Sequence, residues 1–282
     1  MKVFQPNSLA DALQRLATVN GSLVPIAGGT DLCVHWPSRD KDDLQLLDLS
    51  RVRDLPGLRL TGEMLELGAL TSFWEVIDAP DVAAAFPLLA AAARLVGAIQ
   101  IQTRGTWAGN IANGSPAADG VLALLVYDAR VVLQSVAATR EVEIDAYFIG
   151  YKQSVRRPDE LITAIRIPRR SYEFEWLAKV GSRRAQAISK VGVAMLRNGE
   201  GWRVVAGSVA PYVCRCRTLE AALDAGRTFT SAEEVRQVLA ADIAPITDIR
   251  STAEYRARVL SRLIFYRLAE LGGTPSPPRS RG

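Results

Sequence analysis

Apolar residues recur at helical spacing near the start of the chain and then gather into two short runs. Leucines follow Ser8 at intervals of three and four residues, and serine is a favoured helix cap, so we expect a capped first helix. The runs over 23–27 and 44–49 have the length and the polar boundaries of buried strands. Together these segments predict a small β-α-β-like unit that ends near Pro56.

The following hundred residues change between strand and helix patterns. Residues 58–68 alternate between apolar and polar side chains around a turn at 61–63, which is typical of a β-hairpin. We expect helices over 72–78, 83–96 and 120–127, the last apolar enough to be buried, and strands over 130–134, 141–145 and 164–168. Residues 57–170 are therefore expected to form a second subdomain.

Beyond residue 171 the pattern predicts a layer of strands followed by helices. We expect strands over 175–180, 189–196 and 202–209, and helices over 219–226, 232–240 and 252–271. A strand layer backed by helices indicates a smaller α+β domain. The predicted organisation is a domain over 1–170, with subdomains of about 1–56 and 57–170, a second domain over 171–274, and a disordered tail over 275–282.

Composition excludes several classes of protein. The net charge is +4, but the arginines are scattered among acidic residues and the aromatic residues, 7% of the chain, do not follow a basic stripe. We therefore expect no nucleic-acid partner. The N-terminal segment has no apolar targeting region, and no uncharged apolar stretch approaches the length of a membrane span. A cytoplasmic protein without a membrane span is expected.

The three cysteines, Cys33, Cys214 and Cys216, are an odd number, which fits a reducing compartment. A C-x-C pair can bind a metal ion, but two small thiols without a ligand role are the favoured interpretation. An iron–sulfur cluster usually needs four cysteines, so any such cluster is expected in another polypeptide. No metal site is predicted in this chain.

Two glycine-rich segments each follow or interrupt apolar sequence. The first is Gly28-Gly29-Thr30-Asp31-Leu32, directly after the predicted strand over 23–27, and the second spans 103–119. We expect Gly105 and Gly109 to adopt positive φ and to turn backbone N–H groups inward, with Thr106, Asn110 and Ser115 as short polar partners.

A diphosphate is the ligand expected between these two segments. Neither segment has the Lys-Ser/Thr of a P-loop, and neither reads G-x-G-x-x-G before a helix. Each alone is also compatible with an ordinary turn. As a pair they predict two walls of one nucleotide site that is neither a P-loop nor a Rossmann site.

With these segments the chain resembles a known family, the FAD-binding medium subunits of the molybdenum hydroxylases. That family includes the flavin subunits of carbon monoxide, aldehyde, xanthine and aromatic-heterocycle dehydrogenases. The matching segments occur in order and cover nearly the whole chain: 27–32, 67–71, 106–110, 115–119, 160–168, Lys179 and 207–211.

The resemblance implies a fold and a site. The fold is α+β, a two-subdomain FAD-binding domain of the PCMH type followed by a smaller α+β C-terminal domain, with the cofactor in the groove between the subdomains. No catalytic residue and no metal ligand are implied. The implied cofactor-binding residues are Ile26, Ala27, Gly28, Gly29, Thr30, Asp31, Leu32, Val96, Thr106, Trp107, Ala108, Gly109, Asn110, Asp119, Leu161, Ile162 and Lys179.

Two pairs of residues have more specific implied roles. By resemblance, Asp119 holds a hydroxyl or amide of the ribityl–adenine portion. Lys179 stabilises the reduced, anionic flavin, the alternative being a surface lysine with an extended stem. The family usually has Ile-Gly where this chain has Trp107-Ala108. Ala108 is compatible with the site only if it has negative φ or the loop shifts slightly, and Trp107 either stacks on a cofactor ring or fills core.

By resemblance, the chain passes electrons from a small [2Fe–2S] subunit through FAD to NAD or a quinone, beside a large molybdopterin subunit in a heterotrimer. The loop over 181–189, with Arg183 and Arg184, either attracts an anionic acceptor or carries a solvated pair of charges. The alternatives are a stand-alone FAD oxidoreductase and a non-catalytic partner-binding subunit with a degenerate flavin site. His35, the single histidine, is favoured as a structural residue over a general base. Substrate and acceptor stay open.

Overall fold

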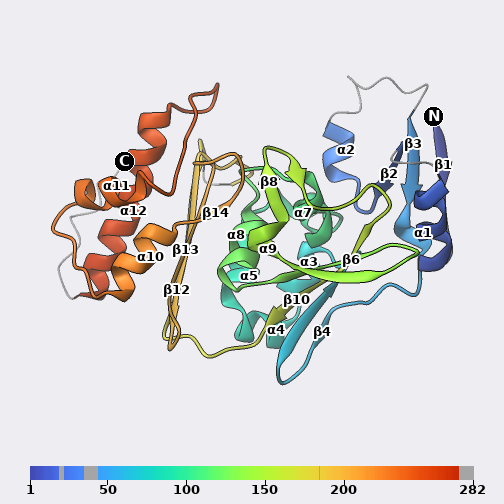
Figure 1. Ribbon diagram of the computed structural model, residues 1–282, viewed down its shortest axis with the longest axis horizontal. Coiled ribbons are helices and arrows are strands. Elements are labelled where there is room, and N and C mark those ends of the chain that lie inside the picture. Colours follow the sequence, from blue (N-terminus) through green and yellow to red (C-terminus); the bar gives the residue numbers. More distant parts are fainter. Residues whose placement is uncertain (19–21, 35–43, 184, 273–282) are drawn as a thin grey trace.

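The computed structural model describes residues 1–18, 22–34, 44–183 and 185–272, which form three packed units (Figure 1). We call them the N-terminal unit (1–52), the middle unit (59–168) and the C-terminal unit (174–271). The expectations for His35, Arg184 and the 275–282 tail lie outside the described residues. Within these residues, no helix combines the length and the apolar character needed to cross a membrane.

The N-terminal unit is a three-stranded parallel sheet in the order β1-β3-β2 with one long helix packed on it. The predicted helix and both predicted strands are confirmed, and the backbone N–H of Asp11 donates to the Oγ of the Ser8 cap at 3.2 Å. The pattern missed β1, which is short and mostly exposed. The elements are β1 (Lys2–Phe4), α1 (Leu9–Thr18), β2 (Leu23–Ile26), α2 (Thr30–Val34), β3 (Gln45–Asp48) and the 3-10 turn η2 (Leu49–Arg51).

The middle unit pairs an antiparallel sheet, in the order β4-β5-β10-β6-β7, with a group of helices around the fully buried α8. The predicted hairpin and the predicted buried helix are both confirmed. A separate pair, β8–β9, lies beside α7 (Figure 1). The elements are β4 (Arg59–Leu60), β5 (Met64–Gly68), α3 (Phe73–Ile77), α4 (Pro80–Ala85), α5 (Pro87–Leu95), α6 (Ile99–Gln102), α7 (Trp107–Asn113), α8 (Asp119–Val126), β6 (Arg130–Gln134), β7 (Thr139–Glu143), α9 (Ile144–Tyr147), β8 (Phe148–Gly150), β9 (Gln153–Ser154) and β10 (Leu161–Pro168).

Three predicted elements of this unit are wrong in extent. The single helix expected over 83–96 is two helices, because Pro87 follows Phe86 and holds it at φ −138°, ψ 67°, outside the helical region. The strand expected over 141–145 ends at Glu143, where α9 begins. The strand expected from 164 starts three residues earlier, at Leu161. Only the break at Phe86 has a clear local cause, the proline that follows it.

The C-terminal unit is an antiparallel sheet in the order β11-β12-β13-β14 with helices on one face. The predicted strands and helices are confirmed to within about two residues at their ends, and only β14 was missed. Together with the middle unit this confirms the α+β class. The elements are β11 (Phe174–Val180), β12 (Val191–Asn198), β13 (Gly201–Gly207), β14 (Cys214–Arg215), α10 (Arg217–Asp224), α11 (Ala232–Leu239) and α12 (Ala253–Leu271).

Both faces of the C-terminal sheet are buried. Along β12, Val193 and Met195 join the core beneath α10–α12, whereas Ala194 and Leu196 join the core of the middle unit. The sheet therefore stands between the C-terminal helices on one side and α5 and α8 on the other, as Figure 1 shows. This packing ties the C-terminal unit to the helices that lead toward the glycine-rich segments.

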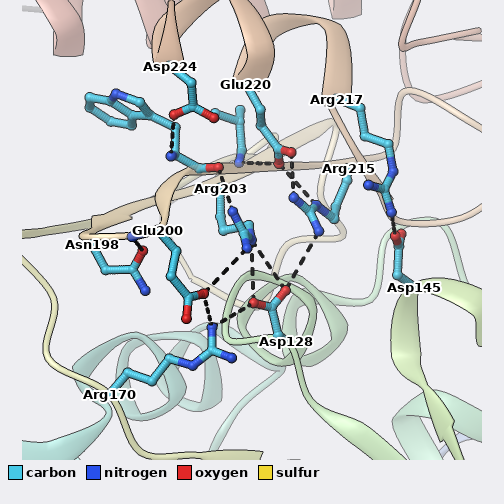
Figure 2. Close-up of polar contacts among 12 residues, drawn as sticks. Asp128, Asp145, Arg170, Asn198, Glu200, Arg203, Arg215, Arg217, Glu220 and Asp224 are labelled. Atoms are coloured by element: carbon cyan, nitrogen blue, oxygen red, sulfur yellow. Dashed lines mark hydrogen bonds and ion pairs between the residues drawn. The ribbon is translucent and has the colours of Figure 1, made fainter.

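A cluster of charges, the junction cluster, links the two units at the end of α8 (Figure 2). Asp128 follows α8 in the left-handed region at φ 54°, a conformation that aspartate tolerates better than most residues. Its carboxylate lies 3.3 Å from Arg170, 3.4 Å from Arg203 and 3.7 Å from Arg215. Three guanidinium groups from the C-terminal unit and the preceding connection therefore converge on one carboxylate of the middle unit.

Two glutamates complete the junction cluster. Glu200 accepts from Arg170 at 2.7 Å, and Glu220 accepts from Arg215 at 2.5 Å. Beside them Arg217 pairs with Asp145 of α9 (Figure 2). Positive and negative groups thus balance at this junction, and their bonds connect α8 and α9 with the C-terminal sheet and α10.

Candidate functional site

A cavity of about 640 Å³ lies between the N-terminal and middle units. Its walls come from β2 and α2 on one side and from α7 and the start of β10 on the other. All but three of the residues that the sequence singled out line it. Those that do are Ile26, Ala27, Gly28, Gly29, Thr30, Asp31, Leu32, Val96, Thr106, Ala108, Gly109, Asn110, Leu161 and Ile162.

The two glycine-rich segments touch each other at Gly28. A Cβ atom at this position would lie 1.7 Å from the carbonyl oxygen of Arg104, a separation that no side chain can occupy. The next residue, Gly29, has φ +71°, in the left-handed region that favours glycine. The turn after β2 is therefore glycine-rich because it must press against the segment before α7 and then reverse.

The second segment is a helix start, and this corrects the expectation for its glycines. Gly105 and Gly109 both lack positive φ, and Thr106 caps α7 by accepting from the backbone N–H of Gly109 at 3.0 Å. A Cβ on Gly105 would lie 2.9 Å from the carbonyl oxygen of Ile101. Glycine is required here for its small size. Ala108 lies within α7 without positive φ, which meets the condition set for it.

Trp107 does not line the cavity. Its side chain is fully buried, its ring centroid lies 4.8 Å from that of Phe73, and its backbone N–H donates to the carbonyl of Thr71 at 3.1 Å. The ring and the backbone N–H therefore make their contacts within the protein, and the indole Nε1 is buried away from the cavity. Trp107 fills core, and the stacking interpretation is wrong for this geometry.

Asp119 and Lys179 lie behind the cavity wall as a buried ion pair. The Nζ of Lys179 donates to the Asp119 carboxylate at 2.6 Å and to the carbonyl oxygen of Leu95 at 2.9 Å, while Ser189 donates to Asp119 at 2.6 Å. Burial raises the pKa of Asp119, and the Lys179 ammonium acts in the opposite direction. The alternative of a surface lysine is wrong, because only 9% of the side chain is exposed. The pair meets the wall through Leu95, which precedes the wall residue Val96.

Several wall residues were not found from the sequence, and two of them are cations. Lys152 lies in the turn between β8 and β9, and Arg156 lies between β9 and β10. Glu160 is also at the wall, where Arg140 donates two hydrogen bonds to its carboxylate at 2.7 and 2.9 Å and thereby lowers its pKa. No local signal marks Lys152 and Arg156, whose place at the cavity depends on how distant segments pack, and Glu160 begins the matching segment 160–168 but was not assigned to the site.

The cysteines of the C-terminal unit have the character of inert thiols. Burial raises the pKa of the Cys214 thiol to about 12, and the fully buried Cys216 is shifted in the same direction. Both are therefore protonated at neutral pH. Within the described residues no group of histidine, cysteine and carboxylate side chains has the arrangement of a metal site.

The residues around the cavity fit a flavin dinucleotide. Thr106, Gly109 and Asn110, at the start of α7, line the cavity opposite the turn at Gly28 and Gly29. Val96, Leu161 and Ile162 supply apolar surface for rings, and the volume lies in the usual range for ligand pockets. The turn at Gly28 and Gly29 brings backbone close to the same space.

Comparison with known proteins agrees with this geometry. Residues 1–170 match the family described as FAD binding domain in molybdopterin dehydrogenase, and residues 176–271 match the CO dehydrogenase flavoprotein C-terminal domain. The carbon monoxide dehydrogenase medium chain of Hydrogenophaga pseudoflava is 28% identical over 267 residues, 92% of each chain. The nicotine 6-hydroxylase medium subunit of Paenarthrobacter nicotinovorans is 29% identical over 95% of each chain.

Solved structures have the same fold. The carbon monoxide dehydrogenase of Hydrogenophaga pseudoflava, in a form lacking the Mo-pyranopterin moiety, superposes with a TM-score of 0.85 at 28% identity and 94% coverage of each chain. A Cu,Mo-CO dehydrogenase superposes with a TM-score of 0.86 at 26% identity, over 94% of this chain and 95% of the other. This chain therefore belongs to the family of FAD-binding medium subunits of the molybdenum hydroxylases, and it is an FAD-dependent oxidoreductase subunit.

Proposed function

We propose that this chain carries electrons from the [2Fe–2S] clusters of a small partner subunit, through FAD, to an external acceptor, either NAD or a quinone. A large partner subunit with molybdopterin oxidises the substrate, and the three chains form a cytoplasmic heterotrimer. The observation that carries the proposal is the cavity between the two glycine-rich segments, which touch each other at Gly28 and Arg104. The relatives are named as medium chains or medium subunits, which supports the presence of partner subunits.

The chain's own residues would hold FAD in three ways. Backbone N–H groups at Gly28, Gly29 and Thr30 would bind the diphosphate as fixed dipoles. Apolar side chains, among them Val96 and Ile162, would exclude water from the rings. When bound, FAD connects one-electron donors with acceptors that take one or two electrons.

Asp119 and Lys179 belong to the proposed site through the wall segment that they hold. The Lys179 ammonium bonds the carbonyl of Leu95, so it fixes the backbone beside Val96. The Asp119 carboxylate, 2.6 Å away, offsets most of its charge. The pair therefore acts on the cofactor mainly by positioning Val96, and its effect on the flavin potential is that of a dipole.

The test is the visible absorption spectrum of the full chain during titration with FAD, followed by assays without and with partner subunits. FAD bound without turnover, and turnover on addition of partners, supports the proposal. Turnover by the chain alone would favour the stand-alone oxidoreductase. Failure to bind FAD would favour the non-catalytic subunit, although the observation behind that alternative is weakened because Ala108 fits α7.

The acceptor is tested separately. The FAD-loaded chain is reduced chemically and mixed with NAD or with a soluble quinone, and reoxidation is followed by absorbance. In the loop over 181–189, the guanidinium of Arg183 donates to the carbonyls of Ala185 at 3.0 Å and Gln186 at 2.7 Å. A loop arginine engaged in this way has fewer donors for an anionic acceptor, so Arg183→Gln is expected to change NAD reduction little.

A further inference from the structure

Two cations on the cavity wall, Lys152 and Arg156, have no ion-pair partner among the residues that the structure describes. Two carboxylates share the wall with them, Asp31 and Glu160. The Glu160 carboxylate is already engaged by Arg140 and by the backbone N–H of Arg157 at 2.7 Å. With Glu160 neutralised by Arg140, the two cations outnumber the one remaining wall carboxylate, Asp31.

Arg156 is held in place by the backbone around it. Its Nη1 donates to the carbonyl oxygen of Glu160 at 2.7 Å and to that of Arg157 at 3.2 Å. A guanidinium has five N–H donors in a rigid plane, so these two bonds fix its orientation and leave donors for a ligand. Ordering this side chain on binding therefore costs little entropy.

Lys152 is held against the end of α7. Its backbone has φ 53°, and a Cβ on Gly114, the residue after α7, would lie 3.2 Å from the Lys152 Cα. This close approach brings the β8–β9 turn to the helix that carries Asn110 and Asn113, both on the cavity wall. Lys152 is exposed and lines the cavity, so the chain presents a solvated lysine there on a fixed backbone.

We infer that Lys152 and Arg156 form a cationic wall that binds the phosphate groups of the dinucleotide, so that the cavity selects FAD over the uncharged riboflavin. The inference rests on the proposed FAD binding. Without these two side chains, only the backbone dipoles of the glycine-rich turns would bind the diphosphate. Two positive charges near a dianion make its binding sensitive to ionic strength. Backbone N–H contacts alone make binding much less sensitive to ionic strength.

The test compares affinities of the full 282-residue chain for FAD and riboflavin, measured by flavin fluorescence at low and high salt. Arg156→Gln and Lys152→Gln each remove one charge, and we expect each to weaken FAD binding about tenfold at low salt, with riboflavin binding unchanged. Arg157→Gln is the matched control, since it removes the same charge from an exposed neighbour outside the cavity wall. The salt dependence of FAD binding should become shallower in the two wall variants only.

The outcomes separate this inference from the proposed function. Failure of the unaltered chain to bind FAD removes the proposed function. FAD binding by Arg156→Gln and Lys152→Gln that equals Arg157→Gln overturns the inference and leaves the function intact. Equal losses of affinity for FAD and riboflavin also overturn it, because the two side chains would then affect binding through the shape of the cavity and not through their charge. Thermal unfolding of each variant without FAD shows whether it folds. Because Lys152 is exposed, Lys152→Gln is expected to fold as the unaltered chain does.

Discussion

The junction cluster around Asp128 and the FAD cavity differ in how their charged groups are paired. At the junction each carboxylate has at least one arginine within 4 Å, and the charges balance. At the cavity, neither Lys152 nor Arg156 has an ion-pair partner among the described residues. Paired charges hold units together, whereas cations without an ion pair on a cavity wall can meet an anionic ligand.

The largest expected effect comes from breaking the buried Lys179–Asp119 ion pair, which lies behind the cavity wall and, unlike the junction cluster, is almost fully buried. Lys179→Met leaves the Asp119 carboxylate buried without its cation, so we expect the free energy of unfolding to fall by about 3–5 kcal/mol. Denaturant unfolding of the FAD-free chain measures it. The double variant Lys179→Met, Asp119→Leu should recover much of the loss, and a double variant as unstable as the single one would contradict the pairing.

Gly28→Ala tests the backbone contact between the two glycine-rich segments at the cavity. The added Cβ would lie 1.7 Å from the Arg104 carbonyl oxygen, so the two glycine-rich segments must separate. We expect FAD binding to be lost and stability to fall by about 3 kcal/mol. FAD titration and thermal unfolding measure the two effects. Gly62→Ala, in a turn where no atom lies within 4 Å of the new Cβ, is the control and should behave as the unaltered chain.

Glu160 tests a paired group on the cavity wall. Hydrogen bonds from Arg140 lower its pKa in the folded chain, so its stabilising effect is present above the unfolded-state pKa of about 4.5 and is lost as pH falls further. We expect Glu160→Gln to cost about 1–2 kcal/mol at pH 7 and progressively less in acid. Unfolding curves from pH 7 to 3 measure this, with the exposed Glu143→Gln as control. A cost independent of pH would refute the assignment.

Asp128→Asn gives the smallest expected effect. Asparagine tolerates the left-handed conformation at φ 54°, so the change removes charge alone from a cluster whose carboxylate is 29% exposed. We expect a loss of about 1 kcal/mol that shrinks at high salt, measured by denaturant unfolding at two ionic strengths. Glu173→Gln breaks an exposed pair with Arg197 and should change nothing measurable. Equal effects of the two variants would show that convergence on Asp128 adds no stability.

The sequence was most informative where burial follows a local period. The apolar run of α8, the capped α1 and the strands of the C-terminal unit appear as predicted, because each buries one face or all faces of a regular element. The 83–96 prediction was wrong because hydrophobic periodicity does not register the break that Pro87 imposes at Phe86. The positive φ expected at Gly105 and Gly109 was wrong because the same glycines serve close packing at a helix start.

By itself, the sequence determined the α+β class, the two glycine-rich segments and the family, since these depend on local patterns and ordered motifs. Only the tertiary structure decided that Gly28 touches Arg104, that Lys179 pairs with Asp119 behind the wall, and that Lys152 and Arg156 reach the cavity. These contacts join residues far apart in the chain. Their geometry is set by how whole elements pack, and periodicity along one segment carries no information about the partner that another segment brings.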